Sequence, residues 1–260
     1  MYSVTGRINI VKQPHGGYLR PSSMDCRTLD DGQTLSEKEN IHSTVMGMAV
    51  DYLTRFAMGT PVEEAFRISL IGADIASEMI GKKAKIEAKK YCRGIKGLDD
   101  KSVINACKLV TFDVWKRNTR GALMAKTAAD TNPDADTVKN IQIMVNRSLQ
   151  FWKEYGPITE DGFTFEPYGY SPIVSSGDGD YLTADTMWDF KVSKSKPNSR
   201  NTLQLLMYWI MGQHSGKPEF KGLKKIGIFN PRLNMVFTYD MSKFPKERIK
   251  EIENEVICYY

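Results

Sequence analysis

The sequence predicts an α/β protein of the α+β type, with a mostly helical first part and a second part that combines short strands with helices. Three observations support this prediction. Apolar side chains recur at helical spacing through residues 36–155, the residues from Asp161 onward alternate as in strands, and a helical pattern over 198–213 separates two groups of strands. The chain has 260 residues and is 41% hydrophobic, which is enough to bury one large core or two small ones.

The first part is expected to begin with a short strand or arm and loops over residues 1–35. Ser36 is followed three residues later by Glu39, which is the pattern of a capping box. A helix is therefore predicted over 37–58, and the turn residues from Gly59 to Pro61 would end it. Further helices are predicted at about 60–80, 99–118 and 134–155.

The second part is expected to begin with a meander of three short strands, which are divided by turn residues. These strands read GFTFEPYGYSPIV, GDGDYLT and TMWDFKVS. A helix over 198–213 should follow, and then two strands over 224–229 and 234–239. A last helix over 244–260 completes the predicted order of elements.

Composition excludes several classes of protein. No apolar run approaches the roughly 18 residues that cross a bilayer, and the first residues lack the pattern of a secretory signal. We therefore expect a cytoplasmic protein without a membrane partner. The cysteines show no Cys-x-x-Cys spacing, so we expect isolated thiols and no iron-sulfur cluster; they are Cys26, Cys92, Cys107 and Cys258. The three histidines are dispersed, which leaves carboxylates as candidate metal ligands.

The excess of positive charge is concentrated in one segment. Within residues 81–97, seven basic residues face Glu87 as the single acid, whereas the whole chain carries a net charge of +5. Such a block can bind nucleic-acid phosphates, and it can equally be a solvated helix face. The candidate phosphate ligands are Lys82, Lys83, Lys85, Lys89, Lys90 and Arg93.

Asp189 and Lys191 form a candidate catalytic pair. They lie two residues apart in a predicted strand, so their side chains should share one face of the sheet. Trp188 and Phe190 would lie on the opposite, apolar face and pack against the core. We expect the face with Asp189 and Lys191 to be open to solvent or substrate.

The preceding strand supplies a second carboxylate. A tight hairpin that turns at Ala184 and Asp185 pairs Asp180 directly with Asp189. Opposed residues have Cβ atoms about 4.5 to 5.5 Å apart, so both carboxylates could hold one divalent ion. The alternative is a pair of edge-strand acids, one of them bonded to Lys191.

Two helices carry further candidates. Gln204 and Tyr208 lie four residues apart and so share one face of the helix over 198–213; alternatively, they are a buried glutamine and a core tyrosine. Asp51 follows Gly47 by one helical turn, and the missing side chain of Gly47 leaves room for a ligand. The alternative for Asp51 is a surface acid that pairs with Arg55.

These motifs together match a known family. The matching residues are GDGDYLTADTMWDFKVSK, followed by LQLLMYWIMG. They resemble the RecB-like exonuclease branch of the PD-(D/E)XK nuclease superfamily, which includes the CRISPR-associated exonucleases. In that branch a helix precedes a three-stranded meander with Gly-x-x-Asp and Asp-x-Lys motifs, and a helix with Gln-x-x-x-Tyr follows. KIGIFNPRLNMVFTY, with Asn230 and Arg232, also resembles the strand that closes the sheet in these nucleases.

The resemblance implies a fold and a domain organisation. It implies a single nuclease domain over 1–260 with a restriction-endonuclease-like core, which is a central mixed β-sheet flanked by helices. The core would comprise 36–58 and 161–260, with a helical insertion at about 59–159. Asp51 departs from the family pattern, because a histidine commonly stands at that place. The cysteines do not reproduce the spacing that holds the iron-sulfur cluster of some members.

The resemblance also implies an activity and residue roles. The expected activity is Mg²⁺- or Mn²⁺-dependent hydrolysis of nucleic-acid phosphodiesters, with DNA as the substrate. Asp180 and Asp189 would hold the metal with the Phe190 carbonyl, and Asp51 would add a ligand. Lys191 would act on the attacking water or on developing charge. Gln204 and Tyr208 would position phosphate or Lys191. The residues that would meet the nucleic-acid backbone are Lys194, Lys196 and Arg200.

Two other functions stay open at this point. The chain could be a nucleic-acid-binding module that keeps the fold without catalysis. It could also be an interaction protein whose helical part binds a helicase or another subunit. A titration with divalent metal would separate the nuclease from the binding module, and co-purification of a partner would support the interaction protein.

Overall fold

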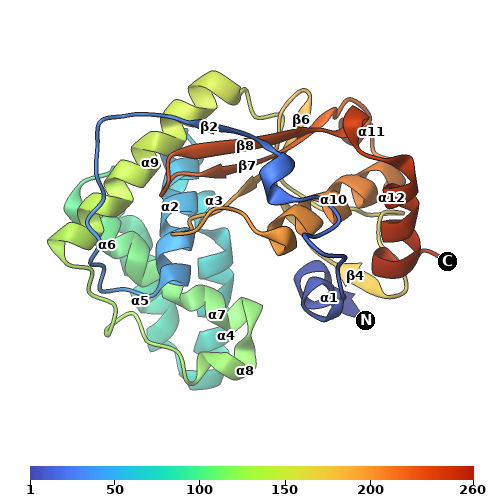
Figure 1. Cartoon of the computed structure of the whole chain (residues 1–260). Helices are drawn as coiled ribbons and strands as arrows, with labels where there is room; N and C mark the ends of the chain where they lie inside the picture. Colours follow the sequence, from blue (N-terminus) through green and yellow to red (C-terminus); the bar gives the residue numbers. More distant parts are fainter. The chain divides into compact units, whose positions relative to one another are not determined.

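A computed structural model describes all 260 residues of the chain. The chain divides into two compact units (Figure 1). One comprises Met1–Leu29 and Trp152–Tyr260 and is called the sheet unit. The other comprises Asp30–Phe151 and is called the helical unit. The protein is thus a mixed α/β protein, and the helical unit is one continuous stretch between the two segments of the sheet unit.

The sheet unit is built on a six-stranded mixed sheet with the order β2-β8-β7-β6-β5-β3. Strands β6 and β7 pair in parallel, and the other neighbours pair antiparallel. The six strands are β2 (Asp25–Thr28), β3 (Glu160–Phe163), β5 (Gly179–Leu182), β6 (Thr186–Phe190), β7 (Lys225–Asn230) and β8 (Met235–Asp240). A separate parallel pair consists of β1 (Tyr2–Ser3) and β4 (Val174–Ser176).

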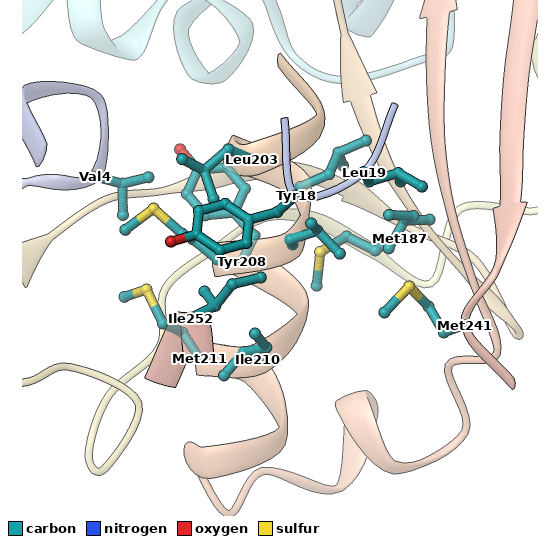
Figure 2. Packing of buried hydrophobic residues seen from close by; sticks show 14 of the residues in the cluster. Val4, Tyr18, Leu19, Met187, Leu203, Tyr208, Ile210, Met211, Met241 and Ile252 are labelled. Carbon is teal, nitrogen blue, oxygen red and sulfur yellow. The ribbon is translucent and has the colours of Figure 1, made fainter. Parts of the chain in front are cut away.

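The helix α10 (Ser199–His214) connects the parallel strands β6 and β7 and packs on one face of the sheet. Asn198 caps it and forms a capping box with Asn201. Around α10 lies the main hydrophobic core of the unit, which Figure 2 shows with Tyr208 among its residues. The other helical segments of this unit are α1 (Val4–Ile10), η1 (Pro21–Ser23), α11 (Pro218–Lys221), η3 (Met241–Lys243), α12 (Lys246–Glu251) and the π-helix η4 (Ile252–Ile257).

Aromatic side chains cover the opposite face of the sheet. The ring of Trp188 on β6 lies 6.5 Å from that of Trp152 and 5.4 Å from that of Tyr155, both edge-on. Trp152 also contacts Tyr181 of β5 at 4.8 Å. The prediction that Trp188 faces a packed apolar layer is therefore confirmed.

The helical unit contains the chain segments predicted to be helical between residues 36 and 155. Its helices are α2 (Ser43–Ala57), α3 (Val62–Ala65), α4 (Arg67–Ile80), α5 (Lys83–Arg93), α6 (Asp100–Leu109), η2 (Val110–Phe112), α7 (Asp113–Arg117), α8 (Thr119–Ala122) and α9 (Ala135–Tyr155), whose last residues from Trp152 belong to the sheet unit. A buried polar cluster links three of them. The Asp113 carboxylate accepts hydrogen bonds from Tyr52 at 2.6 Å and from Ser69. Burial raises the pKa of Asp113, against the lowering effect of these bonds.

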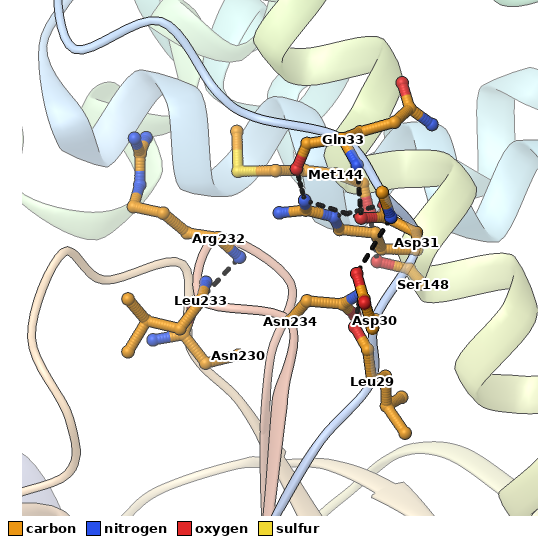
Figure 3. A network of polar contacts seen from close by, with 12 residues as sticks. Leu29, Asp30, Asp31, Gln33, Met144, Ser148, Asn230, Arg232, Leu233 and Asn234 are labelled. Atoms are coloured by element: carbon orange, nitrogen blue, oxygen red, sulfur yellow. Dashed lines mark hydrogen bonds and ion pairs between the residues drawn. The ribbon is translucent and has the colours of Figure 1, made fainter.

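An ion pair fixes the first residues of the helical unit. Arg147, which is 7% exposed, binds both carboxylate oxygens of Asp31, with N–O distances of 2.6 and 2.9 Å, and donates to the Gln33 carbonyl at 2.7 Å (Figure 3). This two-pronged geometry is the strong form of a carboxylate–arginine contact. It holds the pKa of Asp31 below its ordinary value, although partial burial opposes that shift.

The predicted start of the first long helix is wrong. Ser36 and Glu39 do not form a capping box; instead the Ser36 N–H donates to the Asn140 side chain, and the Asn140 amide donates to Glu39, both at 2.8 Å. The helix α2 begins at Ser43, and His42 caps it by accepting from the Thr44 N–H. Ser36 and Glu39 thus bond to Asn140 on the distant helix α9, and the spacing of the two residues does not predict that contact.

Other boundaries also differ from the predictions. The helix α1 lies where a strand or arm and loops were expected, and Phe66 divides the predicted 60–80 helix into α3 and α4. The helix α2 belongs to the helical unit, because it packs with α3, α6 and η2, and its place in a nuclease core stays a prediction. Among the helices, none combines the length and the apolar content that crossing a bilayer requires.

Candidate active site

The β5–β6 hairpin brings two predicted site residues together. Tyr181 pairs with Trp188 and Leu182 with Met187, and the Thr183 N–H donates to the Thr186 carbonyl at 2.9 Å. This is the predicted register, and its continuation places Asp180 opposite Asp189. The Asp180 Oδ2 atom accepts a hydrogen bond of 2.8 Å from the N–H of Phe190, so the Asp180 side chain reaches across to the end of β6.

Asp189 is a buried carboxylate whose two oxygens differ. Its side chain is 2% exposed, and its Oδ1 atom accepts from Lys191 Nζ at 2.9 Å. Its Oδ2 atom is buried and has no hydrogen-bond partner. Because a buried carboxylate oxygen without a partner is costly, this atom is a position where a further ligand would be stabilised.

Lys191 connects this pair to the surface. Its side chain is 31% exposed and lies where β6 leaves the sheet. Burial lowers the pKa of Lys191, but the charges of Asp189 and Asp180 and the hydrogen bond to Asp189 raise it more, so the net shift is upward. The lysine is therefore a cation at neutral pH.

The face that holds these residues is covered, which corrects the expectation of an open face. Leu182 and Met187 lie on the same face as Asp180 and Asp189, and both are completely buried in the core. The reason is the connection between β6 and β7: a helix that links two parallel neighbours must pack on the sheet, and α10 covers this face. The carboxylate pair thus lies at the margin of the core.

Gln204 and Tyr208 meet on α10 as their spacing predicts. The Gln204 amide donates to the Tyr208 hydroxyl at 3.0 Å, and Tyr208 is 5% exposed. Burial raises the pKa of Tyr208, and the charges of Asp189, Asp180 and Asp178 add to this effect although the bond from Gln204 opposes it. The tyrosine hydroxyl is therefore protonated and within the electrostatic influence of the carboxylate pair.

Asp51 has a different setting. It lies on α2 in the helical unit, where its Oδ1 atom pairs with Arg55 at 3.1 Å. The two side chains are 21% and 17% exposed, respectively. The ion pair that was the alternative for Asp51 is thus formed, and a role of Asp51 as a metal ligand stays a prediction.

The predicted phosphate ligands occur in two groups. Lys194, Lys196 and Arg200 are exposed in the segment from the end of β6 to the first turn of α10. The basic block forms α5, whose buried residues Ala84, Ala88 and Cys92 recur every four positions. Its candidate phosphate ligands are all exposed, and two also pair with acids: Lys83 with Glu87 at 3.7 Å, and Lys85 with Asp74 at 2.8 Å.

Sequence reasoning gave no role to Asn230, which is 1% exposed at the end of β7. Its amide donates to the carbonyl of Ser193, two residues after Lys191, at 2.8 Å. The available signal was an asparagine before a proline at the end of a predicted strand, which favours a turn but does not identify the distant partner.

The carboxylate pair fits a hard divalent cation. Carboxylate oxygens are the ligands that Mg²⁺ and Mn²⁺ prefer, and the buried Asp189 Oδ2 atom has no other partner. No group of three or more histidine, cysteine or acidic side chains gathers in the structure, so any additional ligands would have to come from the main chain, substrate or water. The cysteines are free thiols, with Cys92 and Cys107 in the helical unit and Cys26 and Cys258 in the sheet unit.

In comparisons with known proteins, no protein-family model, curated protein or solved structure matches this chain.

Proposed function

We propose that the protein is a metal-dependent nuclease that hydrolyses phosphodiester bonds and acts on DNA as an exonuclease. The observation that carries the proposal is the unpartnered buried oxygen of Asp189, opposite Asp180 and beside the Lys191 ammonium. A purely structural ion pair would not require a second acid in register with the first.

The order of elements supports a restriction-endonuclease-like core in this proposal. The strands β3, β5 and β6 are consecutive antiparallel neighbours in the sheet, α10 follows them, and β7 then pairs in parallel with β6. This is the order that the sequence motifs imply, and the candidate residues lie on β5, β6 and α10. The proposal also includes the cytoplasm as the compartment of the protein, and a helicase or another subunit as its protein partner.

Asp180, Asp189 and Lys191 have different roles in the proposed hydrolysis. Asp180 and Asp189 would hold Mg²⁺ or Mn²⁺, and the bound ion would neutralise phosphate charge and lower the pKa of a water molecule. Asp189 keeps Lys191 oriented through the 2.9 Å bond. Lys191 would act as a cation and hydrogen-bond donor toward the attacking water or the developing phosphate charge, because its ammonium group is held beside the carboxylate pair.

Gln204 and Tyr208 have a supporting part. The Gln204 amide donates to the Tyr208 hydroxyl oxygen, so the hydroxyl proton remains for donation to an acceptor. Because Tyr208 is buried and its pKa is raised, it donates a hydrogen bond and does not act as a phenolate. It would position a phosphate oxygen or a carboxylate.

The test is an assay of linear and circular DNA, single- and double-stranded, with Mg²⁺, with Mn²⁺ and with EDTA, together with RNA. The proposal expects cleavage of linear DNA that requires a divalent ion and is absent in Asp189→Asn. Binding of DNA without cleavage in either metal would instead identify a non-catalytic module. A protein that neither binds nor cleaves nucleic acid but co-purifies with a subunit would identify an interaction protein.

A further inference from the structure

We propose that Asn230 is a positioning residue, which holds the segment 191–198 so that Lys191 stays at the carboxylate pair and Lys194 and Lys196 present fixed charges to nucleic-acid phosphates. The inference rests on the proposed function and concerns how the protein holds its substrate. At the end of β6 the chain leaves the sheet to enter α10.

The ladder between β6 and β7 ends in two different bonds. Phe190 pairs with Phe229, and the Lys191 N–H donates to the Phe229 carbonyl at 2.9 Å. Beyond Lys191 a side chain continues the connection, because the Asn230 amide donates to the Ser193 carbonyl at 2.8 Å. Ser193 is therefore attached to β7 although it lies outside the sheet.

The orientation of the Asn230 amide is fixed from its other side. The Oδ1 atom accepts from the N–H groups of Arg232 at 3.0 Å and Leu233 at 3.3 Å, which closes the turn between β7 and β8 (Figure 3). With the oxygen held by two donors, the nitrogen must point to Ser193. Asn230 is 1% exposed, so water does not replace these bonds readily.

The segment that Asn230 holds carries the charges that a substrate would meet. Lys194 and Lys196 are exposed and follow the bonded Ser193 directly. Within the segment, the Ser195 N–H donates to the Ser193 hydroxyl at 3.1 Å, and Asn198 then caps α10. Bonds thus hold the segment at Lys191 and at Ser193 before Asn198 begins α10, and the bond at Ser193 comes from the Asn230 side chain.

The chain offers a matched control in Asn234, at the other end of the same turn (Figure 3). Asn234 is 5% exposed, and its amide donates to the Leu29 carbonyl, so it joins β8 to the end of β2. Asn230→Asp and Asn234→Asp each replace a buried amide donor by an oxygen of the same shape, and each adds one carboxylate, so the two variants are matched in charge. Only Asn230→Asp removes a bond to the segment 191–198.

The experiment measures DNA binding in EDTA as a function of salt, together with amide hydrogen exchange over residues 190–198, in the full-length protein. Asn230→Asp should speed exchange in this segment and weaken binding about fivefold or more, because mobile lysines must be ordered on binding. The slope of log K against log salt should stay unchanged, because the same ion pairs still form. Lys194→Gln with Lys196→Gln should instead reduce the slope by about 1.4 to 1.8.

The outcomes separate this inference from the proposed function. In the Lys194→Gln, Lys196→Gln background, Asn230→Asp should weaken binding by less than about twofold, because the residues it positions are gone. If Asn230→Asp and Asn234→Asp weaken binding equally, or if exchange in the segment is unchanged, the inference is wrong. Neither result contradicts the proposed nuclease function. Absent nuclease activity with the expected exchange and binding results would overturn the proposed function alone.

Discussion

Asp180 and Phe190 are joined across the β5–β6 hairpin, where the Asp180 carboxylate accepts a 2.8 Å hydrogen bond from the Phe190 main chain. The bond holds one acid over the end of the strand that bears the other. Two carboxylates in such register repel each other, and a shared cation would relieve that repulsion. The mutational behaviour of the protein should follow from this arrangement.

Asp180→Asn and Asp189→Asn should each abolish the stabilisation of the protein by divalent ions. Binding to the folded state alone raises the melting temperature, and each substitution removes a charged ligand while keeping its shape. The measurement is the shift in Tm with increasing Mn²⁺ or Mg²⁺. Asp185→Asn is the control, because Asp185 lies in the turn of the same hairpin and not in the site. Its carboxylate pairs with Lys225, with an N–O distance of 3.2 Å. A full metal-induced shift in Asp189→Asn would contradict the site.

Lys191→Ala should separate catalysis from metal binding. It removes a cation that acts on water or on transition-state charge, so the rate of DNA hydrolysis should fall by a factor on the order of 10². The Mn²⁺-induced shift in Tm should persist, because both carboxylates remain. Lys225→Ala, which removes the partner of Asp185, should cleave DNA at the parental rate. If Lys191→Ala also cleaves at that rate, the proposed role of Lys191 is wrong.

The exposed face of α5 should contribute to DNA affinity. Replacing Lys82, Lys89 and Lys90 with Gln should reduce the salt slope of binding by about 2 to 3, since each lost phosphate contact retains nearly one counterion on the DNA. The matched control replaces Lys243, Lys246 and Lys250, which are exposed in the sheet unit. Equal slopes for the two triple variants would mean that α5 is only a solvated face.

Asp31→Asn should weaken the helical unit in a pH-dependent way. The pKa of Asp31 is lowered chiefly by Arg147, so the ion pair stabilises the fold above the unfolded value near 3.8, and this contribution is lost as pH falls through the folded pKa. At neutral pH the variant should lose about 1 to 3 kcal/mol in the free energy of unfolding. Urea unfolding at pH 7 and near pH 3 measures the difference, which should shrink at the lower pH.

Asp30→Asn is the control for that measurement. Asp30 precedes Asp31 and accepts a hydrogen bond from the Gly32 N–H at 2.9 Å, but its contact is with the main chain and not with an arginine. At pH 7 the Asp30→Asn variant should lose less free energy of unfolding than the Asp31→Asn variant. A loss in Asp31→Asn that is the same at both pH values would show that the charge of Asp31 is not what stabilises the unit.

The parts of the fold that local pattern determines were predictable. The register of the β5–β6 hairpin follows from alternation and from the turn at Ala184 and Asp185, and α10 follows from the helical pattern over 198–213. The parts that distant packing determines were not. The helix α1 has only seven residues, and it is stabilised by burying Val4 and Ile8 in a core with α10.

The candidate site shows the same division. The sequence placed Asp180, Asp189 and Lys191 on one face, but it did not predict that the Asp189 side chain would be buried. That burial depends on how α10 crosses the sheet, which the sequence of β6 does not contain. The bond from Asn230 to Ser193 was missed for a related reason: it joins residues 37 positions apart through a turn whose partner no local motif specifies.

The placement of β2 has a consequence for synthesis of the protein on the ribosome. Asp25 pairs with Thr238, so β2 is synthesised early, and more than 200 further residues are added before its neighbour β8 is complete. The whole helical unit is translated during that interval and can fold, whereas the early strand has an unpaired edge. Nascent chains that stop before β8 should therefore contain a folded helical unit and an unfolded, aggregation-prone first segment. The six-stranded sheet can form only after translation of β8 is complete.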